Sequence, residues 1–396
     1  MALEEAVALA EALPDLEIVG SAVVPLRDPH PGHLFGTGKI EELRQQIHDA
    51  EVELVLVDGP VSPVQQRNLE KEWKVKLLDR TGLILEIFSD RAATREGVLQ
   101  VEMAALSYQR TRLVRAWTHL ERQRGGLGFV GGPGETQIEA DRRAIDEQLV
   151  RLRRQLERVV KTRDLHRKAR AKVPYPIVAL VGYTNAGKST LFNRLTGAEV
   201  MAKDMLFATL DPTMRAVKLP TGIDVILSDT VGFISDLPTE LVAAFRATLE
   251  EVLAADIIVH VRDISHPNTE EQAADVAAIL DSLGVEEDVP LVELWNKTDR
   301  LAPDVHEGVL QRASREETIF AVSALTGEGL DTMLEAITER LQGETNDEEL
   351  RLAFDDGKRR SWLFKKGLVQ DELQDEDGFV LQVRWSAKDR AQFETL

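Results

Sequence analysis

A glycine-rich loop between an apolar strand and a helix constrains this chain more than any other feature. Residues 177–181 have the pattern of a buried strand, and residues 182–189 follow with the spacing G-x-x-x-x-G-K-S. Glycine lets such a loop curl until successive backbone N–H groups point at a phosphate. Residues 190–195 predict a helix whose positive end faces the same phosphate. Strand, loop and helix together predict a P-loop fold.

The same loop predicts the contacts to phosphate and metal. Lys188 is expected to neutralise the β- and γ-phosphate oxygens, and Ser189 to bind Mg²⁺. A second buried strand is expected at 223–227, and the sequence D-T-V-G follows it, ending at Gly232. There Asp229 would hold Mg²⁺ through water, while the Gly232 N–H would meet the γ-phosphate. The loop after Gly232 would be released when that phosphate leaves, which describes a switch.

The base is expected to be guanine. The sequence N-K-T-D ends at Asp299 and follows another apolar run, 290–295. The carboxylate of Asp299 can accept two hydrogen bonds from N1 and N2 of guanine, and adenine lacks that pair of donors. A site built on such paired bonds rejects the wrong base by orders of magnitude. The run Ser323-Ala324-Leu325, after a strand expected at 319–322, would support guanine from the other side.

A further Mg²⁺ ligand is expected between the P-loop and Asp229. Residues 207–213 contain two threonines, and Thr209 is preferred over Thr213 as the group that caps Mg²⁺ in the GTP state. The predicted nucleotide-binding residues are therefore Gly182, Tyr183, Thr184, Asn185, Ala186, Gly187, Lys188, Ser189, Phe207, Ala208, Thr209, Leu210, Asp211, Asp229, Thr230, Val231, Gly232, Asn296, Lys297, Asp299, Ser323, Ala324 and Leu325.

The catalytic machinery is incomplete by comparison with many GTPases. Those enzymes place a glutamine just after D-x-x-G to orient the attacking water, and here that position is Phe233, whose ring cannot hydrogen-bond a water. Asn185 resembles the asparagine of GTPases that bind K⁺ beside the phosphates, although it could also serve only to shape the loop. Lys188, Asn185 and Gly232 are the expected catalytic residues. Intrinsic hydrolysis is expected to be slow and stimulated by a partner.

Composition indicates the cellular compartment of the chain and the kind of partner it could bind. The chain has 396 residues and a net charge of −20, yet residues 107–172 hold 17 Lys and Arg against 8 Asp and Glu. Such a basic segment indicates a contact surface or a solvated helical face. There are no cysteines, which excludes disulfides and fits a cytoplasmic protein. The sequence predicts no membrane span and no signal peptide, and no metal besides Mg²⁺ and K⁺.

The chain divides into four predicted parts. Residues 1–97 read as a small α/β unit with a mainly parallel sheet, in which strands are expected at 18–24, 54–57 and 75–78. In residues 98–172, leucine, isoleucine and valine repeat every seven residues on two long helices, which predicts an antiparallel hairpin with a Gly-rich tip. Residues 173–343 form the Ras-like P-loop domain. Residues 344–396 form a small α+β domain after a polar linker at 343–347, with strands at 350–354, 368–373 and 379–385.

Several stretches resemble the HflX family, a branch of the Obg-related translational GTPases. They are G-T-G-K-I-E-E-L at 36–43, D-R-T-G-L-I-L-E-I-F at 79–88, G-G-P-G-E-T-Q at 131–137, and the runs 207–213 and 229–233. The resemblance covers residues 15 to 395. It implies binding to the large ribosomal subunit, hydrolysis stimulated by the ribosome, and splitting or rescue of stalled ribosomes under stress.

The resemblance gives the hairpin tip a purpose. Six of the ten residues at 125–134 are glycine, so the tip carries little bulk and could enter a cavity lined by RNA. Arg122 and Arg124 would then contact phosphates, and Phe129 could stack on a base. The alternative is a plain flexible turn between two helices.

Other functions stay open at this point. One alternative is a GTP-regulated scaffold for a protein or membrane partner, which would allow peripheral membrane association. Another is ATP-dependent RNA remodelling through the N-terminal region, although that region has no Walker A motif of its own. The chain is expected to act as a monomer.

Overall fold

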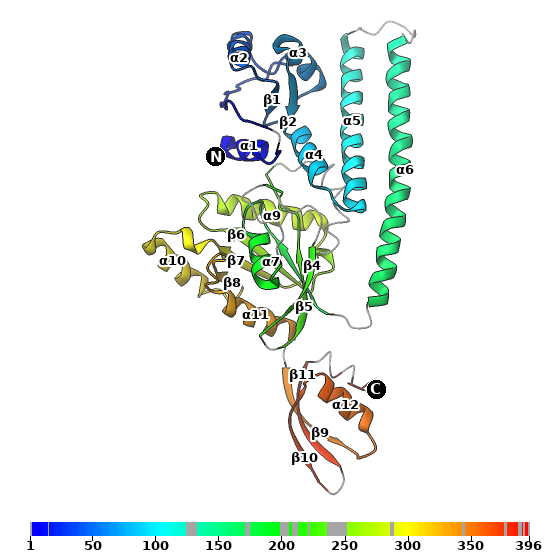
Figure 1. Ribbon diagram of the computed structural model, residues 1–396, viewed down its shortest axis with the longest axis vertical. Helices are drawn as coiled ribbons and strands as arrows, with labels where there is room; N and C mark the ends of the chain where they lie inside the picture. The colour runs from blue at the N-terminus through cyan, green and yellow to red at the C-terminus, as the bar shows by residue number, and fades with distance from the viewer. Residues whose placement is uncertain are drawn as a thin grey trace.

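In the computed structural model the N-terminal unit, the P-loop domain and the C-terminal unit follow one another along the longest axis, and a helical hairpin lies beside the first two (Figure 1). The structure describes residues 2–14, 16–123, 133–170, 175–198, 206–207, 213–220, 222–235, 252–285, 289–342, 345–375, 378–386, 390 and 393–394. The fold is mixed α/β with a Ras-like P-loop domain at its centre. The predicted division at residues 97, 172 and 343 stays a prediction.

The N-terminal unit contains a two-stranded parallel sheet flanked by helices. Ser62 caps one helix, because its side chain accepts from the Gln65 N–H while the Gln65 side chain accepts from the Ser62 N–H. The elements are α1 (Ala2–Glu11), α2 (Thr37–Asp49), β1 (Leu54–Val57), α3 (Pro63–Trp73), β2 (Lys76–Asp79) and α4 (Arg80–Arg91). The parallel pairing of β1 with β2 agrees with the sequence prediction.

The strand predicted at 18–24 was wrong. This stretch forms no strand, and Val19 and Val23 are 58% and 71% exposed. An apolar run becomes a strand only where a neighbouring strand pairs with its backbone and another layer covers its side chains. Here the described residues cover neither valine, so the apolar pattern was not sufficient to predict a strand.

The helical hairpin agrees with the heptad prediction. Helices α5 (Arg95–Gln123) and α6 (Pro133–Arg170) run side by side in opposite directions (Figure 1). Leu99 of α5 and Leu149 and Leu152 of α6 are buried, as their heptad positions require. Midway along its length, α5 is tied to the N-terminal unit by the buried Asp79, which accepts hydrogen bonds from the Tyr108 hydroxyl and the Arg112 guanidinium.

The P-loop domain is built on a six-stranded sheet in the order β4-β5-β3-β6-β7-β8, in which only β4 is antiparallel to its neighbour. Its strands are β3 (Ile177–Val181), β4 (Thr213–Lys218), β5 (Asp224–Asp229), β6 (Ile257–Asp263), β7 (Leu291–Asn296) and β8 (Ile319–Ala321). Its described helices are α7 (Lys188–Thr196), α9 (Thr269–Leu283), η1 (Thr298–Arg300), α10 (Pro303–Ala313) and α11 (Leu330–Gln342). Parallel strands end at one edge of a sheet, so the loops after β3, β5, β7 and β8 converge there.

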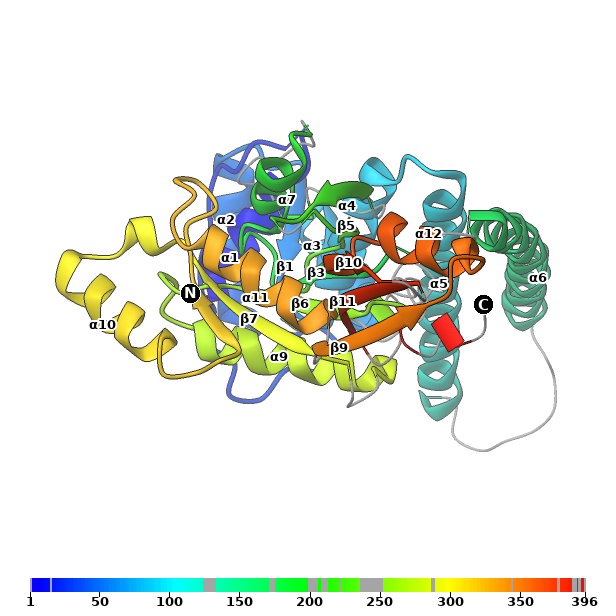
Figure 2. The same ribbon diagram turned by 90° about the horizontal axis from the view of Figure 1, so that it is seen from below.

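Two apolar layers cover this sheet. Alternate residues of each central strand face opposite layers, so Val178 and Leu180 pack with α7 and α11, whereas Ala179 and Val181 pack with α9. Figure 2 shows the sheet with α7 and α9 on opposite sides.

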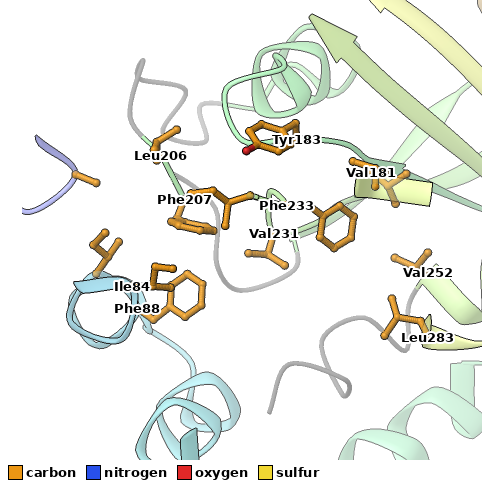
Figure 3. Packing of buried hydrophobic residues seen from close by; sticks show 14 of the residues in the cluster. Ile84, Phe88, Val181, Tyr183, Leu206, Phe207, Val231, Phe233, Val252 and Leu283 are labelled. Atoms are coloured by element: carbon orange, nitrogen blue, oxygen red, sulfur yellow. The ribbon is translucent and has the colours of Figure 1, made fainter. Parts of the chain in front are cut away.

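The core on the α9 side continues beyond the P-loop domain. It includes side chains of α1, α4 and α5, so the N-terminal unit and the P-loop domain share one core. Figure 3 shows Ile84 and Phe88 of α4 facing Phe207, Val231 and Phe233 of the P-loop domain. The rings of Phe88 and Phe207 pack edge to face, with centroids 4.7 Å apart.

The C-terminal unit is an antiparallel sheet, in the order β10-β11-β9, with one helix against it. Its elements are β9 (Thr345–Leu352), α12 (Gly357–Lys365), β10 (Val369–Gln374) and β11 (Phe379–Ser386). The strands predicted at 368–373 and 379–385 are confirmed as β10 and β11, which pair antiparallel. The strand predicted at 350–354 begins earlier, at Thr345, and takes up most of the predicted linker, because β11 continues to Ser386 and pairs with that polar stretch.

Candidate nucleotide site

The P-loop needs glycine at two positions for steric reasons. A Cβ on Gly182 would lie 2.2 Å from the carbonyl oxygen of Val261, and a Cβ on Gly187 would lie 2.2 Å from Nδ2 of Asn296. Both glycines have a positive φ, of 148° and 100°, and Asn185 between them has a φ of 57°. The loop therefore has the curled backbone that the sequence predicted.

Lys188 is buried at the start of α7. Its Nζ donates to the carbonyl oxygens of Gly182 and Tyr183, at 3.0 and 2.8 Å. The pKa of Lys188 is lowered to about 8: burial lowers it most, Asp229 opposes the shift, and the nearby Lys297 adds to it. The ammonium group is thus held inside the P-loop in an environment where added negative charge, such as a phosphate, would stabilise it.

Nucleotide affinity is expected to fall as the pH rises above about 8. Without nucleotide, Lys188 loses its proton with a pKa of about 8, while a bound phosphate favours the charged form. Binding above this pH must therefore take up a proton, so the affinity falls by up to about tenfold for each pH unit. The test is a titration with fluorescent GDP from about pH 7 to about pH 9. Guanosine, which has no phosphate, serves as the control, and an equal pH dependence for both ligands would contradict the prediction.

The predicted Mg²⁺ ligands are only partly described. The Ser189 hydroxyl donates to Oδ2 of Asp229 at 2.8 Å, so a hydroxyl and a carboxylate meet at the carboxyl ends of β3 and β5. Oxygen donors of this kind fit Mg²⁺. Thr209 lies outside the described residues, as do Ala208, Leu210 and Asp211. Thr213, the alternative, begins β4 and pairs in register with Asp229.

Asn296 connects two of the predicted loops. Its Nδ2 donates to the carbonyl oxygen of Ala186 at 2.8 Å, and its Oδ1 accepts from the Ala324 N–H at 2.9 Å. The residue is buried, and its role in holding the two loops was not predicted from the sequence. The Asn296 amide therefore holds the P-loop and the 323–325 loop against the end of β7.

The remaining base-side residues converge as predicted. Asp299 accepts from the Ser323 hydroxyl at 2.5 Å, which orients the carboxylate proposed to read guanine. Lys297 has a φ of 68° and its Nζ pairs with Asp263 at 2.7 Å. Leu325 is 70% exposed, as a side chain that covers a bound base would be.

Sequence reasoning missed one residue of the site. Arg194, on α7, donates to the carbonyl oxygens of Leu325 and Thr326 at 2.7 and 2.6 Å. It thereby fixes the 323–326 loop to the helix that follows the P-loop. No local motif marks this arginine, because its partners lie more than 130 residues further along the chain.

Phe233 lies beside the P-loop, but its ring does not face the site. The ring is fully buried in the core shared with the N-terminal unit. Its backbone bonds to the P-loop twice: the Phe233 N–H donates to the Gly182 carbonyl at 3.1 Å, and the Phe233 carbonyl accepts from the Thr184 N–H at 2.7 Å. The geometry agrees with the expectation that this side chain orients no water.

The structure leaves the predicted RNA contacts untested. Arg124 and Phe129 lie outside the described residues, and only the backbone of Arg122 is described. Among the described residues, no helix is long and apolar enough to cross a membrane. The described part of the chain also holds no group of three or more His, Cys, Asp and Glu side chains suited to a metal ion.

Comparison with family models matches almost the whole chain. The models are described as GTP-binding GTPase N-terminal (residues 1–89), GTP-binding GTPase middle region (91–170), 50S ribosome-binding GTPase (177–297) and HflX C-terminal domain (308–395). A GTPase HflX from Magnetococcus marinus is 51% identical over 350 residues, which is 88% of this chain and 79% of the relative. The GTPase HflX of Escherichia coli is 45% identical over 357 residues, 90% and 83% of the two chains.

Solved structures give a weaker likeness. A GTP-binding protein from Sulfolobus solfataricus in complex with GDP is 24% identical, with a TM-score of 0.47, over 85% of this chain and 94% of that chain.

Proposed function

The chain belongs to the HflX family of GTPases, and from that premise we propose that it is a cytoplasmic GTP-driven switch that binds the large ribosomal subunit. Its work would be to split or rescue stalled ribosomes under stress. The observation that carries this proposal is the assembled guanine-nucleotide site, which lies largely within the residues that match a 50S ribosome-binding GTPase model.

The hairpin supports this choice of partner by its charge. Helix α6 exposes a series of arginines to solvent, and ribosomal RNA is a polyanion. Those whose side chains are described and exposed are Arg142, Arg143, Arg151, Arg153, Arg154 and Arg158. Glutamates one turn away offset Arg143 and Arg151, at 3.9 and 3.7 Å. Arg153 and Arg154, which are adjacent and have no such glutamate in the described structure, are chosen to test the proposed surface.

The proposal is tested by the rate of GTP hydrolysis with and without purified large ribosomal subunits. We expect stimulation of at least about tenfold, because a partner can complete a GTPase site that lacks its own water-orienting side chain. The double substitution of Arg153 and Arg154 by Glu is expected to remove most of the stimulation while the intrinsic rate stays unchanged. Unstimulated hydrolysis and no GTP-dependent co-sedimentation would favour a scaffold for another partner. ATPase activity that survives Lys188→Ala would favour the N-terminal ATP alternative.

The metal ions belong to the same proposal. Mg²⁺ would be held by Ser189 and Thr209 and, through water, by Asp229, and when bound it would neutralise charge on the β- and γ-phosphates. Only the Ser189–Asp229 pair is described. This chain's own contribution is to keep that hydroxyl and that carboxylate together at the ends of two adjacent strands.

We propose in addition that K⁺ binds beside Asn185. Asn185 is exposed, unlike its neighbours Thr184 and Ala186, and its backbone is left-handed, with a φ of 57°. A monovalent cation there would offset negative charge on the phosphates during hydrolysis, as an arginine finger does in other GTPases. We expect hydrolysis to be about tenfold faster in KCl than in NaCl at equal ionic strength, and Asn185→Ala to abolish the difference. Equal rates in the two salts would refute the K⁺ site.

A further inference from the structure

Four side chains from distant parts of the chain form a closed hydrogen-bonded group beside the P-loop, which we name the Glu5 cluster. It consists of Glu5 in α1, Arg80 at the start of α4, Tyr183 in the P-loop, and Ser235, three residues after Gly232. The Tyr183 hydroxyl donates to Oε2 of Glu5 at 2.7 Å, and the Ser235 hydroxyl donates to Oε1 at 2.6 Å. The cluster therefore joins the N-terminal unit to both loops of the phosphate site.

Arg80 completes the cluster from the other side. It forms ion pairs with Glu5 and Asp58, and it donates to the carbonyl oxygen of Ser235 at 2.8 Å. Its side chain is only 9% exposed. A buried guanidinium needs such partners, because a charge left unpaired in a buried site is strongly destabilising.

The cluster keeps its charges at neutral pH. Burial acts to raise the pKa of Glu5, but hydrogen bonds from Ser235, Arg80 and Tyr183 outweigh it, so the pKa lies below its usual value. Burial raises the pKa of Tyr183, so its hydroxyl keeps its proton. All these hydrogen bonds can therefore exist together under physiological conditions.

Tyr183 links the cluster to the switch backbone. Its hydroxyl oxygen accepts from the Ser235 N–H at 2.7 Å. The two neighbours of Tyr183 in the chain, Gly182 and Thr184, each form a backbone hydrogen bond with Phe233. The segment 233–235 is thus held to the P-loop by three hydrogen bonds. The third of these bonds depends on a hydroxyl that Glu5 orients.

The position of this segment bears directly on hydrolysis. Because the Phe233 ring is buried in the core, residues 232 and 233 can meet the γ-phosphate and the attacking water only with backbone groups, above all the Gly232 N–H. Gly232 lies close against the P-loop, since a Cβ there would be 2.9 Å from Cα of Thr184 and 3.1 Å from Nζ of Lys188. A preorganised donor accelerates a reaction only when it stays in place.

We propose that Glu5 and Arg80 are positioning residues for GTP hydrolysis: through Tyr183 and Ser235 they hold the 232–235 backbone in register with the P-loop. Helix α1, more than 170 residues before the P-loop tyrosine, is then part of the supporting structure of the catalytic site. Neither Glu5 nor Arg80 is among the residues that the sequence predicts to contact nucleotide.

The first test is Tyr183→Phe in the full-length chain, assayed without ribosomes. This change removes one hydroxyl, keeps the ring and the P-loop backbone, and leaves no charge unpaired. We expect kcat for GTP hydrolysis to fall about tenfold, while KM and GDP affinity stay within about twofold, because only the register of the switch backbone is lost.

Tyr108→Phe is the matched control. Tyr108 is another partly buried tyrosine whose hydroxyl donates to a carboxylate, that of Asp79, and burial raises its pKa as well. It lies on α5, its ring packs against the shared core, and its described hydrogen bonds go to Asp79 and Arg112 and not to the P-loop or residues 232–235. The Tyr108→Phe variant is expected to lose about as much thermal stability as Tyr183→Phe, while its kcat for GTP hydrolysis stays unchanged. An equal loss of kcat in both variants would overturn the proposal, because the effect would then follow stability alone.

A double-mutant cycle tests the part played by the N-terminal unit. Glu5→Ala is expected to lower kcat about as much as Tyr183→Phe, and the double variant to be no slower than either single variant, because both act through one cluster. Glu5→Gln, which keeps an acceptor for Ser235, should recover part of the rate. Additive losses, an unchanged or faster Tyr183→Phe enzyme, or a shift in KM equal to that in kcat would each refute the proposal. None of these outcomes depends on whether the ribosome is the partner.

Discussion

Replacing Asp299 by asparagine is expected to weaken GTP binding about 10³-fold and to create a site for xanthosine triphosphate. The carboxylate offers two acceptors to the N1 and N2 donors of guanine, whereas the asparagine amide offers one acceptor and one donor. Xanthine carries an oxygen in place of the guanine amino group, so it matches the amide. The Ser323 hydroxyl, 2.5 Å from Oδ1 of Asp299, can still donate to the oxygen of the new side chain. The loop should therefore keep its shape.

The measurement is the affinity of wild-type and Asp299→Asn protein for fluorescent GDP and for the xanthosine analogue. Recovery of binding with xanthosine is the internal control, since a misfolded site would bind neither nucleotide. Equal loss for both nucleotides would show that Asp299 supports the loop and does not read the base.

Replacing Gly232 by alanine is expected to lower kcat for GTP hydrolysis about 10²-fold and to leave GDP binding almost unchanged. The added Cβ would lie 2.8 Å from Cγ2 of Thr184, 2.9 Å from its Cα and 3.1 Å from Nζ of Lys188. The backbone of Thr184 cannot yield easily, so the switch backbone must lift away from the P-loop. The Gly232 N–H then loses its place beside the γ-phosphate, a group that GDP lacks.

Single-turnover hydrolysis, with GDP affinity measured in parallel, distinguishes this result from general damage. Gly308→Ala is the control, because this glycine lies within α10 and an added Cβ would meet nothing within 4 Å. Alanine should stabilise that helix slightly, with no effect on hydrolysis. If the Gly232→Ala variant hydrolysed GTP at the normal rate, the predicted contact between the Gly232 N–H and the γ-phosphate would be refuted.

Much of the fold could be predicted because its signals are local. Strand β3, the loop after it and helix α7 follow from the apolar run and the glycine spacing of residues 177–195. The heptad leucines likewise indicated the paired helices, and Leu152 is buried where the repeat places it. In both cases the residues that define the element are neighbours in the chain.

Predictions failed where a distant segment decides the outcome. The apolar stretch at 18–24 lacks the pairing and cover that would make it a strand, whereas the polar stretch that begins at Thr345 became part of β9 because β11 extends beside it. Backbone hydrogen bonding to a neighbour outweighs the composition of the segment itself. Neither outcome can be read from the residues of the segment alone.

In the candidate site, too, some features could be predicted from the sequence and others could not, and the glycine-rich loop belongs to the first group. The sequence by itself determined the phosphate loop, the position of the carboxylate predicted to read guanine and the absence of a water-orienting side chain at Phe233, because each depends on residue type at a fixed spacing behind a strand. Only the tertiary structure decided that the Phe233 ring is buried, that Asn296 and Arg194 brace the loops, and that Glu5 and Arg80 reach the switch. These contacts join residues up to 230 positions apart, and such pairs come together only when the shared core forms.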